Sequence, residues 1–308
     1  MVFQSKENEM FEDRPTIMND IEFYKLQNDP FKMNGSVIDF SMMEEDIPYF
    51  PHHKHIYRTD EFGEIVKGLG HVGKEYPLTT HRDFFSQQHD MMQSKFSSNE
   101  LDNLVCKYKI SRDGAWALQD ITFPNVKHTI DNGKHKTELA LRHASWHSVD
   151  ASASNNSVFG IMDFFCTNMS MNGEYDIIKK KNTKNFDMTR FINEIEQSVD
   201  KFYATSEKYQ TWATRDITFQ NAQKVIEFLP VPKGKKDKLL TTYIMEANER
   251  GNNMWALYST FTNYSSHHKG NGFSFNKSKH DHVAQSMLKR EFEVANWIHT
   301  EEFVKLAA

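Results

Sequence analysis

Residues 104–123, LVCKYKISRDGAWALQDITF, carry the clearest β-strand pattern in the chain. Apolar and polar side chains alternate over residues 104–110, as they do in a strand with one buried face. Arg112-Asp113-Gly114 then predicts a tight turn, and residues 115–123 predict the returning strand. We therefore expect an antiparallel β-hairpin at this point of the chain.

The region after the hairpin extends it into a sheet. Asp131-Asn132-Gly133 marks a second turn, and residues 138–149 alternate in polarity as a strand does. Residues 158–168 predict one further strand. The simplest model is an antiparallel sheet of four or more strands.

Two helices are expected on the N-terminal side of the hairpin. A short one is predicted over residues 60–67, followed by a turn in the glycine-rich segment GLGHVG, residues 68–73. A second is predicted from about Thr80 to Phe96, with apolar side chains along one side.

The C-terminal half is predicted to be mostly helical. From residue 187, apolar side chains recur at the three-and-four spacing of an amphipathic helix. Asp216 is the expected N-cap of a helix over residues 217–229, and residues 233–238, KGKKDK, read as a polar linker. Further helices are expected around residues 239–244 and 283–298. The fold class is therefore α+β, with a sheet in the front half packed by a mostly helical C-terminal half.

Charge is distributed unevenly along the 308 residues, whose formal net charge is −5. Residues 1–50 hold 11 acidic and 4 basic residues, so they carry −7 and the remainder carries +2. We predict an acidic N-terminal arm over residues 1–50 and a single domain over residues 51–308, sheet-rich over 51–170 and helix-rich over 185–308. A globally basic nucleic-acid binder is excluded, but a local basic surface is not.

The composition also bears on compartment. Cys106 and Cys166 both lie in apolar or alternating stretches, where a cysteine usually behaves as a small buried hydrophobic residue. The N-terminus has no apolar run of signal-peptide length, and no segment approaches a membrane span. We expect a soluble cytoplasmic protein with no membrane partner.

Motifs for cofactors or metals are weak. The fifteen histidines include no His-Glu-x-x-His pattern, and the two cysteines form no Cys-x-x-Cys pair. GLGHVG at residues 68–73 has the letters of a dinucleotide-binding loop, but the predicted helix before it and the Tyr76-Pro77 after it are the wrong context. We predict no metal and no cofactor.

Several blocks in this sequence resemble one known family. GHVGKEYPL at residues 70–78, WHSVD at 146–150, FCTN at 165–168, FLPVP at 228–232 and WALYSTFTNY at 255–264 follow in order. They are similar to the phage/plasmid-like protein family catalogued as domain of unknown function 932, over about residues 60–300. One departure is Ala151, where that family favours a glycine after the Ser-x-Asp block.

The resemblance implies a bacteriophage or plasmid protein associated with DNA metabolism, such as recombination or the handling of single strands. It implies no settled activity and no catalytic residues. In the leading hypothesis the protein is not an enzyme and binds single-stranded DNA with lysines that neutralise phosphates and rings that stack on bases. Its predicted contacts are Lys107, Tyr108, Lys109, Arg112, Trp116 and Lys127.

Two alternatives stay open. One is an enzyme of unknown reaction that uses a polar pocket formed by His143, His147, Asp150, Asn168, Asn263 and His267. The other is a structural or assembly component of a virus. The sequence also leaves open whether the protein forms a homo-oligomer.

Overall fold

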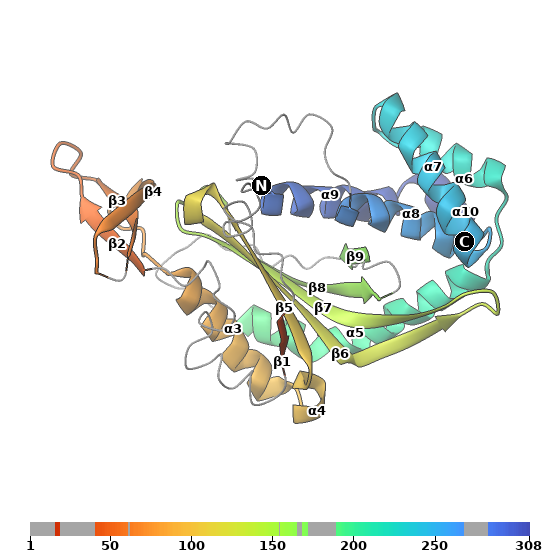
Figure 1. Ribbon diagram of the computed structural model, residues 1–308, viewed down its shortest axis with the longest axis horizontal. Helices are drawn as coiled ribbons and strands as arrows, with labels where there is room; N and C mark the ends of the chain where they lie inside the picture. The colour runs from red at the N-terminus through yellow and green to blue at the C-terminus, as the bar shows by residue number, and fades with distance from the viewer. Residues whose placement is uncertain are drawn as a thin grey trace, which may run out of the picture.

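A six-stranded antiparallel sheet forms the centre of the computed structural model, and a three-stranded sheet lies at one end of it (Figure 1). The structure describes residues 16–18, 41–60, 62–153, 155–164, 168–171, 189–267 and 283–308. The larger sheet has the order β1-β5-β6-β7-β8-β9, formed by β1 Thr16–Met18, β5 Leu104–Ser111, β6 Trp116–Asp131, β7 Lys136–Ser148, β8 Asn156–Asp163 and β9 Asn168–Met171. The predicted α+β class is confirmed.

Strands β5 and β6 are the predicted hairpin. They pair in antiparallel register from Val105↔Thr122 to Ser111↔Trp116. The turn between them, Arg112–Gly114, has positive φ at all three residues, at 56°, 57° and 109°. Gly114 adopts such a conformation freely, and aspartate tolerates it better than most residues.

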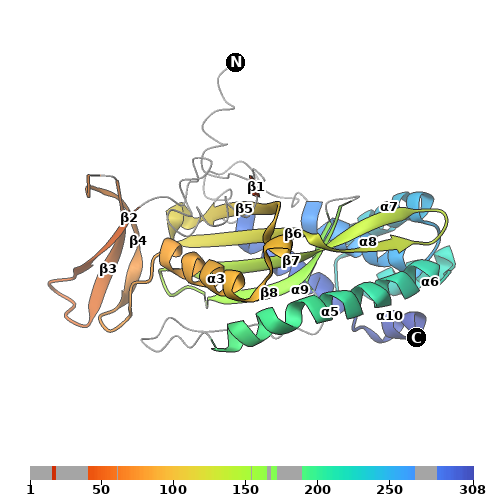
Figure 2. The same cartoon turned by 90° about the horizontal axis from the view of Figure 1, so that it is seen from below.

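Helices cover both faces of the six-stranded sheet (Figures 1 and 2). Helix α3, His81–Lys95, and helix α5, Thr189–Thr214, pack on one face. Helix α9, Val283–Trp297, crosses the other face, and α8, Met254–His267, packs beside it. Alternate residues of β7 therefore point into two different layers, so that His147 contacts α3 and Arg142 contacts α9.

Helix α3 confirms the second predicted helix. The Thr80 side chain accepts a hydrogen bond from the Asp83 backbone N–H, and Asp83 accepts one from the Thr80 backbone in return. This capping box satisfies two backbone donors that a helix start otherwise leaves unpaired. The buried side of the helix includes Phe84, Phe85 and Met92.

The three-stranded sheet corrects the prediction for residues 60–73. Strands β2 Ser41–Asp46, β3 His53–Thr59 and β4 Ile65–Gly73 replace the expected helix and turn. Asp60 accepts hydrogen bonds from the backbone N–H groups of Phe62 and Glu64, so it closes a hairpin loop and starts no helix. β2 also brings residues 41–46, expected in the N-terminal arm, into this sheet.

Three corrections concern the C-terminal helices. Thr218, not Asp216, caps α6 Phe219–Phe228, because its side chain accepts from the Asn221 N–H. Residues 233–238 are not a linker but the first turns of α7 Lys233–Arg250, since lysine is a good helix former and Pro232 has the φ of a helix start. The sequence predicted neither α8 nor α10 Glu301–Ala307.

Among the described residues, Cys106 is fully buried, as predicted, while Cys166 lies outside them. None of the described helices is both long enough and apolar enough to span a bilayer.

Candidate nucleic-acid interface

The six residues predicted to contact DNA do not form one open surface in the part of the chain that the structure describes. Lys107, Tyr108 and Lys109 lie on β5, but their side chains are outside the described residues. Trp116 is only 5% exposed and packs against Leu118 and Trp146, so its ring is not accessible to a base. The two remaining cations form ion pairs, Arg112 with Asp150 at 2.8 Å and Lys127 with Glu138 at 3.0 Å.

The six polar candidates are also divided. His143 and His147 are buried under α3, and Asp150 follows the end of β7. Asn263 and His267 line a cleft beside α7, and the Asn168 side chain lies outside the described residues. Asp150 acts electrostatically on His81, which contacts His147, so the described side chains occupy two regions, one at α3 and the end of β7 and one at the cleft, and the structure does not bring them into one pocket.

Four buried histidines lie between α3 and the sheet. His81 Nδ1 is 2.8 Å from His147 Nδ1, His89 Nε2 is 2.7 Å from the Gln119 amide nitrogen, and His143 Nε2 is 2.5 Å from Ser157 Oγ. Burial lowers the pKa of His81 and His89 to about 4, and that of His143 to about 3. Burial also lowers the pKa of His147, and His81 lowers it further.

These four imidazoles are therefore neutral at pH 7. These side chains are at most 1% exposed, so a substrate cannot reach them from solvent, and we interpret the cluster as part of the core. Within the described ranges, no group of three or more His, Cys, Asp or Glu side chains is arranged to hold a metal ion.

Asp150 is the centre of a junction between the two sheets. Its side chain accepts from Ser148 Oγ at 2.6 Å and from the Ser152 N–H at 3.0 Å, besides its ion pair with Arg112. Gly70 of β4 lies directly against it. Two of the sequence blocks that carry the family resemblance, GHVGKEYPL and WHSVD, thus meet in space.

A substitution at Gly70 tests the packing of β4 against Asp150 at this junction. A Cβ added at Gly70 would lie 2.7 Å from the Cβ of Asp150, closer than real Cβ contacts. We expect Gly70→Ala to lower the free energy of unfolding by about 1–3 kcal/mol, the usual cost of overpacking. The matched control is Gly68→Ala in the same strand, because no atom lies within 4 Å of its added Cβ. Urea unfolding at pH 7 measures both, and equal midpoints for the two variants would contradict the packing argument.

Ala151, the departure from the family pattern, has a φ of 57°. This is the left-handed region, which costs a residue with a side chain about 1–2 kcal/mol more than glycine. A glycine would adopt this conformation at a lower cost in free energy, and this chain adopts it with an alanine.

A basic surface outside the six predicted contacts lies where α7 begins, at the lysine run of residues 233–238. We define the lysine corner as the exposed ring of Phe228, at the end of α6, with Lys233, Lys235, Lys236 and Lys238 of α7. Phe228 is 59% exposed. Lys236 Nζ donates to the carbonyl oxygen of Glu227, the residue before Phe228, so this lysine is tied to the end of α6. The KGKKDK run was visible in the sequence, and the structure adds that it begins a helix and reaches back to the end of α6, where Phe228 is exposed.

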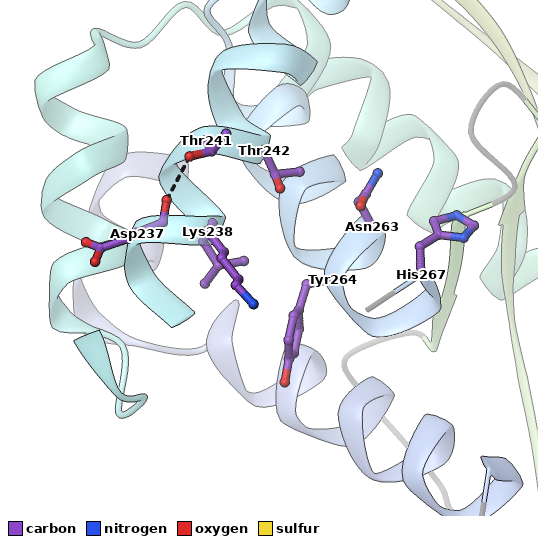
Figure 3. A pocket seen from close by; sticks show the side chains of 8 residues that line it. Asp237, Lys238, Thr241, Thr242, Asn263, Tyr264 and His267 are labelled. Atoms are coloured by element: carbon purple, nitrogen blue, oxygen red, sulfur yellow. Dashed lines mark hydrogen bonds between the residues drawn. The ribbon is translucent and has the colours of Figure 1, made fainter. Parts of the chain in front are cut away.

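A cleft of about 480 Å³ continues from the lysine corner between α7 and α8 (Figure 3). Lys238 and Thr242 enter it from α7, and Asn263, Tyr264 and His267 enter it from α8. Asn263 and His267 were polar candidates from the sequence, while Lys238, Thr242 and Tyr264 were not.

Comparison with known protein families gives a match over most of the chain. A family model described as Domain of unknown function (DUF932) matches residues 68–292. The chain belongs to the DUF932 family. The DUF932 match runs from β4 to α9, so it includes the Asp150 junction, the lysine corner and the cleft. No curated protein and no solved structure matches the chain.

Proposed function

We propose that this DUF932 protein is a phage-encoded, non-enzymatic protein of DNA metabolism that binds single-stranded DNA in the host cytoplasm, as an accessory of recombination or replication. The phage origin and the role in DNA metabolism rest on the family resemblance. The lysine corner supports the DNA-binding part, and it replaces the β5–β6 surface as the proposed contact.

The observation that carries the proposal is a local excess of positive charge beside an exposed ring. Residues 233–238 hold four lysines and one aspartate, so they carry +3 in a chain whose net charge is −5. Single-stranded DNA is held by cations that neutralise its phosphates and by rings that stack on its bases. Phe228 and the lysines of α7 supply both groups at one place.

The start of α7 adds to this charge. No side chain caps its N-terminus, where Pro232 is the N-cap residue. The unpaired N–H groups of a helix start carry a partial positive charge, which favours phosphate nearby. The helix also holds the four lysines at a defined spacing, which a flexible linker would not.

The test is a triple variant, Lys233→Gln/Lys235→Gln/Lys236→Gln, with binding of a labelled dT20 measured by fluorescence anisotropy across salt concentrations. We expect the slope of log K against log salt to become shallower by about 2, at about 0.7 for each phosphate contact to a single strand. Phe228→Ala is expected to weaken binding by about 1–3 kcal/mol through lost stacking.

Matched controls change the same number of lysines and rings elsewhere. Lys134→Gln/Lys136→Gln/Lys201→Gln removes three exposed lysines outside the corner, and Phe62→Ala removes a ring that is 82% exposed in the loop between β3 and β4. Both controls should bind like the wild type. The proposal is wrong if dT20 does not bind at 50 mM salt (about a 14 Å Debye length), or if the controls lose as much affinity as the corner variants.

A further inference from the structure

We infer that the cleft between α7 and α8 binds an organic phosphate monoester, with the phosphate on Lys238 and the organic part against Leu239 and Tyr264. The ligand would be a nucleoside monophosphate, either free or as the 5′-phosphorylated end of a strand. In the second form the inference rests on the proposed function, since the strand would be the one held at the lysine corner.

The first argument is the charge of Lys238. Within the described chain, its ammonium has no ion-pair or hydrogen-bond partner, whereas Lys235 pairs with Glu293 at 3.5 Å and Lys236 binds a backbone carbonyl. The neighbouring Asp237 also lines the cleft, and its carboxylate points away from the Lys238 ammonium (Figure 3). Lys238 thus brings a positive charge without an ion-pair partner to the cleft, which favours binding of an anion.

The second argument is the set of donors that line the same cleft. Thr242 contributes a hydroxyl group, His267 an imidazole, and Asn263 an amide whose nitrogen donates to Glu246 at 3.3 Å and keeps a second N–H. Together with Lys238, these side chains offer hydrogen bonds to a tetrahedral anion from two helices. A phosphate monoester, with up to two negative charges and several acceptor oxygens, matches them.

The third argument is the size and the lining. A volume of about 480 Å³ is in the range of small-molecule pockets and much more than a bare phosphate requires. Leu239 and Tyr264 contribute apolar surface. Tyr264 is only 8% exposed and is held in place by a stacked Trp297 and by Lys235 over its ring at 4.7 Å. The rest of the ligand therefore has a rigid wall to pack against.

The position of the cleft connects it to the lysine corner. Lys235 and Lys238 are three residues apart on α7 and so lie on the same side of the helix. A strand held at the corner could place its terminal nucleotide in the cleft. Lys238 favours an end over an internal nucleotide, because a terminal phosphate monoester carries more negative charge than an internal phosphodiester.

The experiment compares dT20 with a 5′-phosphate and dT20 with a 5′-hydroxyl, both labelled at the 3′ end, on the full chain. We expect the phosphorylated strand to bind about tenfold more tightly, equal to about 1.4 kcal/mol. Lys238→Gln should remove this difference, while the control Asp237→Asn should keep it. The double variant Lys233→Gln/Lys236→Gln, which leaves Lys235 over the Tyr264 ring, should weaken both strands alike.

A second arm identifies the source of the phosphate. Thymidine monophosphate and inorganic phosphate are titrated calorimetrically into the wild type and into Lys238→Gln. Binding of the nucleotide to the wild type alone supports the cleft, even if neither strand binds and the proposed function fails. If the two strands bind with equal affinity and thymidine monophosphate does not bind, the inference about the cleft is wrong, while the proposed function is not affected. If inorganic phosphate binds as well as the nucleotide, the cleft does not recognise a monoester.

Discussion

Arg142→Met is expected to lower the free energy of unfolding by about 3–5 kcal/mol, the usual effect of leaving buried charges without their partner. Arg142 Nε and Nη2 bind the two oxygens of Asp120 at 2.7 and 2.6 Å, and Nη1 binds Glu291 at 2.6 Å. All three side chains are buried between the sheet and α9. The variant leaves two carboxylates in an apolar layer, and urea unfolding at pH 7 measures the loss.

The charge state of Arg142 supports this size of effect. Burial by itself lowers the pKa of Arg142, but Asp120 and Glu291 act against it and leave the pKa above its ordinary value. The guanidinium therefore stays charged at every pH at which the protein folds, and it holds β6, β7 and α9 together.

Two further variants separate charge from packing. Glu291→Gln keeps the shape and one ion pair, so we expect a smaller loss of about 1–3 kcal/mol. Arg142→Met/Asp120→Leu/Glu291→Met removes all three charges and should recover most of the stability, because apolar replacements of a buried ion cluster are often neutral or stabilising. A triple variant less stable than Arg142→Met would show that the buried charges are not the cause.

Acidification should unfold the protein well above the pH at which carboxylates titrate. The four histidines under α3 have pKa values lowered by burial, to about 4 for His81 and His89 and about 3 for His143. In the unfolded chain each has a pKa near 6.5. Below pH 6.5 the unfolded state therefore takes up protons that the folded state does not, and stability is lost as pH falls.

The loss is steep because the four groups act together. Each contributes up to about 1.4 kcal/mol per pH unit between pH 6.5 and the folded pKa, so His81, His89 and His143 contribute about 6 kcal/mol by pH 5, and His147 adds to this loss. A stability of about 5–15 kcal/mol is typical of a folded domain. We expect a cooperative transition between pH 6 and pH 4.5, followed by circular dichroism, with urea unfolding at each pH giving the proton uptake.

His89→Gln is the informative variant for this transition. A glutamine can still hydrogen-bond to Gln119 but does not titrate, so proton uptake on unfolding at pH 5.5 should fall by about one. His299→Gln is the matched control, because it replaces an exposed histidine between α9 and α10. It should leave the uptake unchanged. If the wild type and both variants unfold only below pH 4, the titration of carboxylates, and not of the buried histidines, causes the acid unfolding.

The sequence predicted elements whose polarity has a clear period. The β5–β6 hairpin and α3 each bury one side and expose another, so alternation and the capping Thr80 reveal them. Helix α8 escaped prediction because nearly its whole circumference is buried, which removes the helical period. The three-stranded sheet escaped because β4 contains three glycines, which weaken a strand pattern.

The candidate site was harder to predict for a similar reason. Alternation placed His143 and His147 on one face of a strand, but it could not show that α3 covers that face. Trp116 looked like a ring beside cations, yet it points into the layer under α9. Contacts such as Arg142 with Glu291, which are 149 residues apart, have no local signal at all.

The turn between β6 and β7 shows how the two halves of the chain depend on each other. The Asn132 side-chain amide donates to the carbonyl oxygens of Ala213 and Arg250, at the ends of α5 and α7. Gln210 of α5 also exchanges two hydrogen bonds with the Asp131 backbone. The tip of a hairpin is usually the first part of a sheet to fray, but here it is hydrogen-bonded to two helices. The sheet-rich and helix-rich halves therefore follow each other along the chain but do not form separate folding units. We expect the molecule to unfold in one cooperative transition on heating.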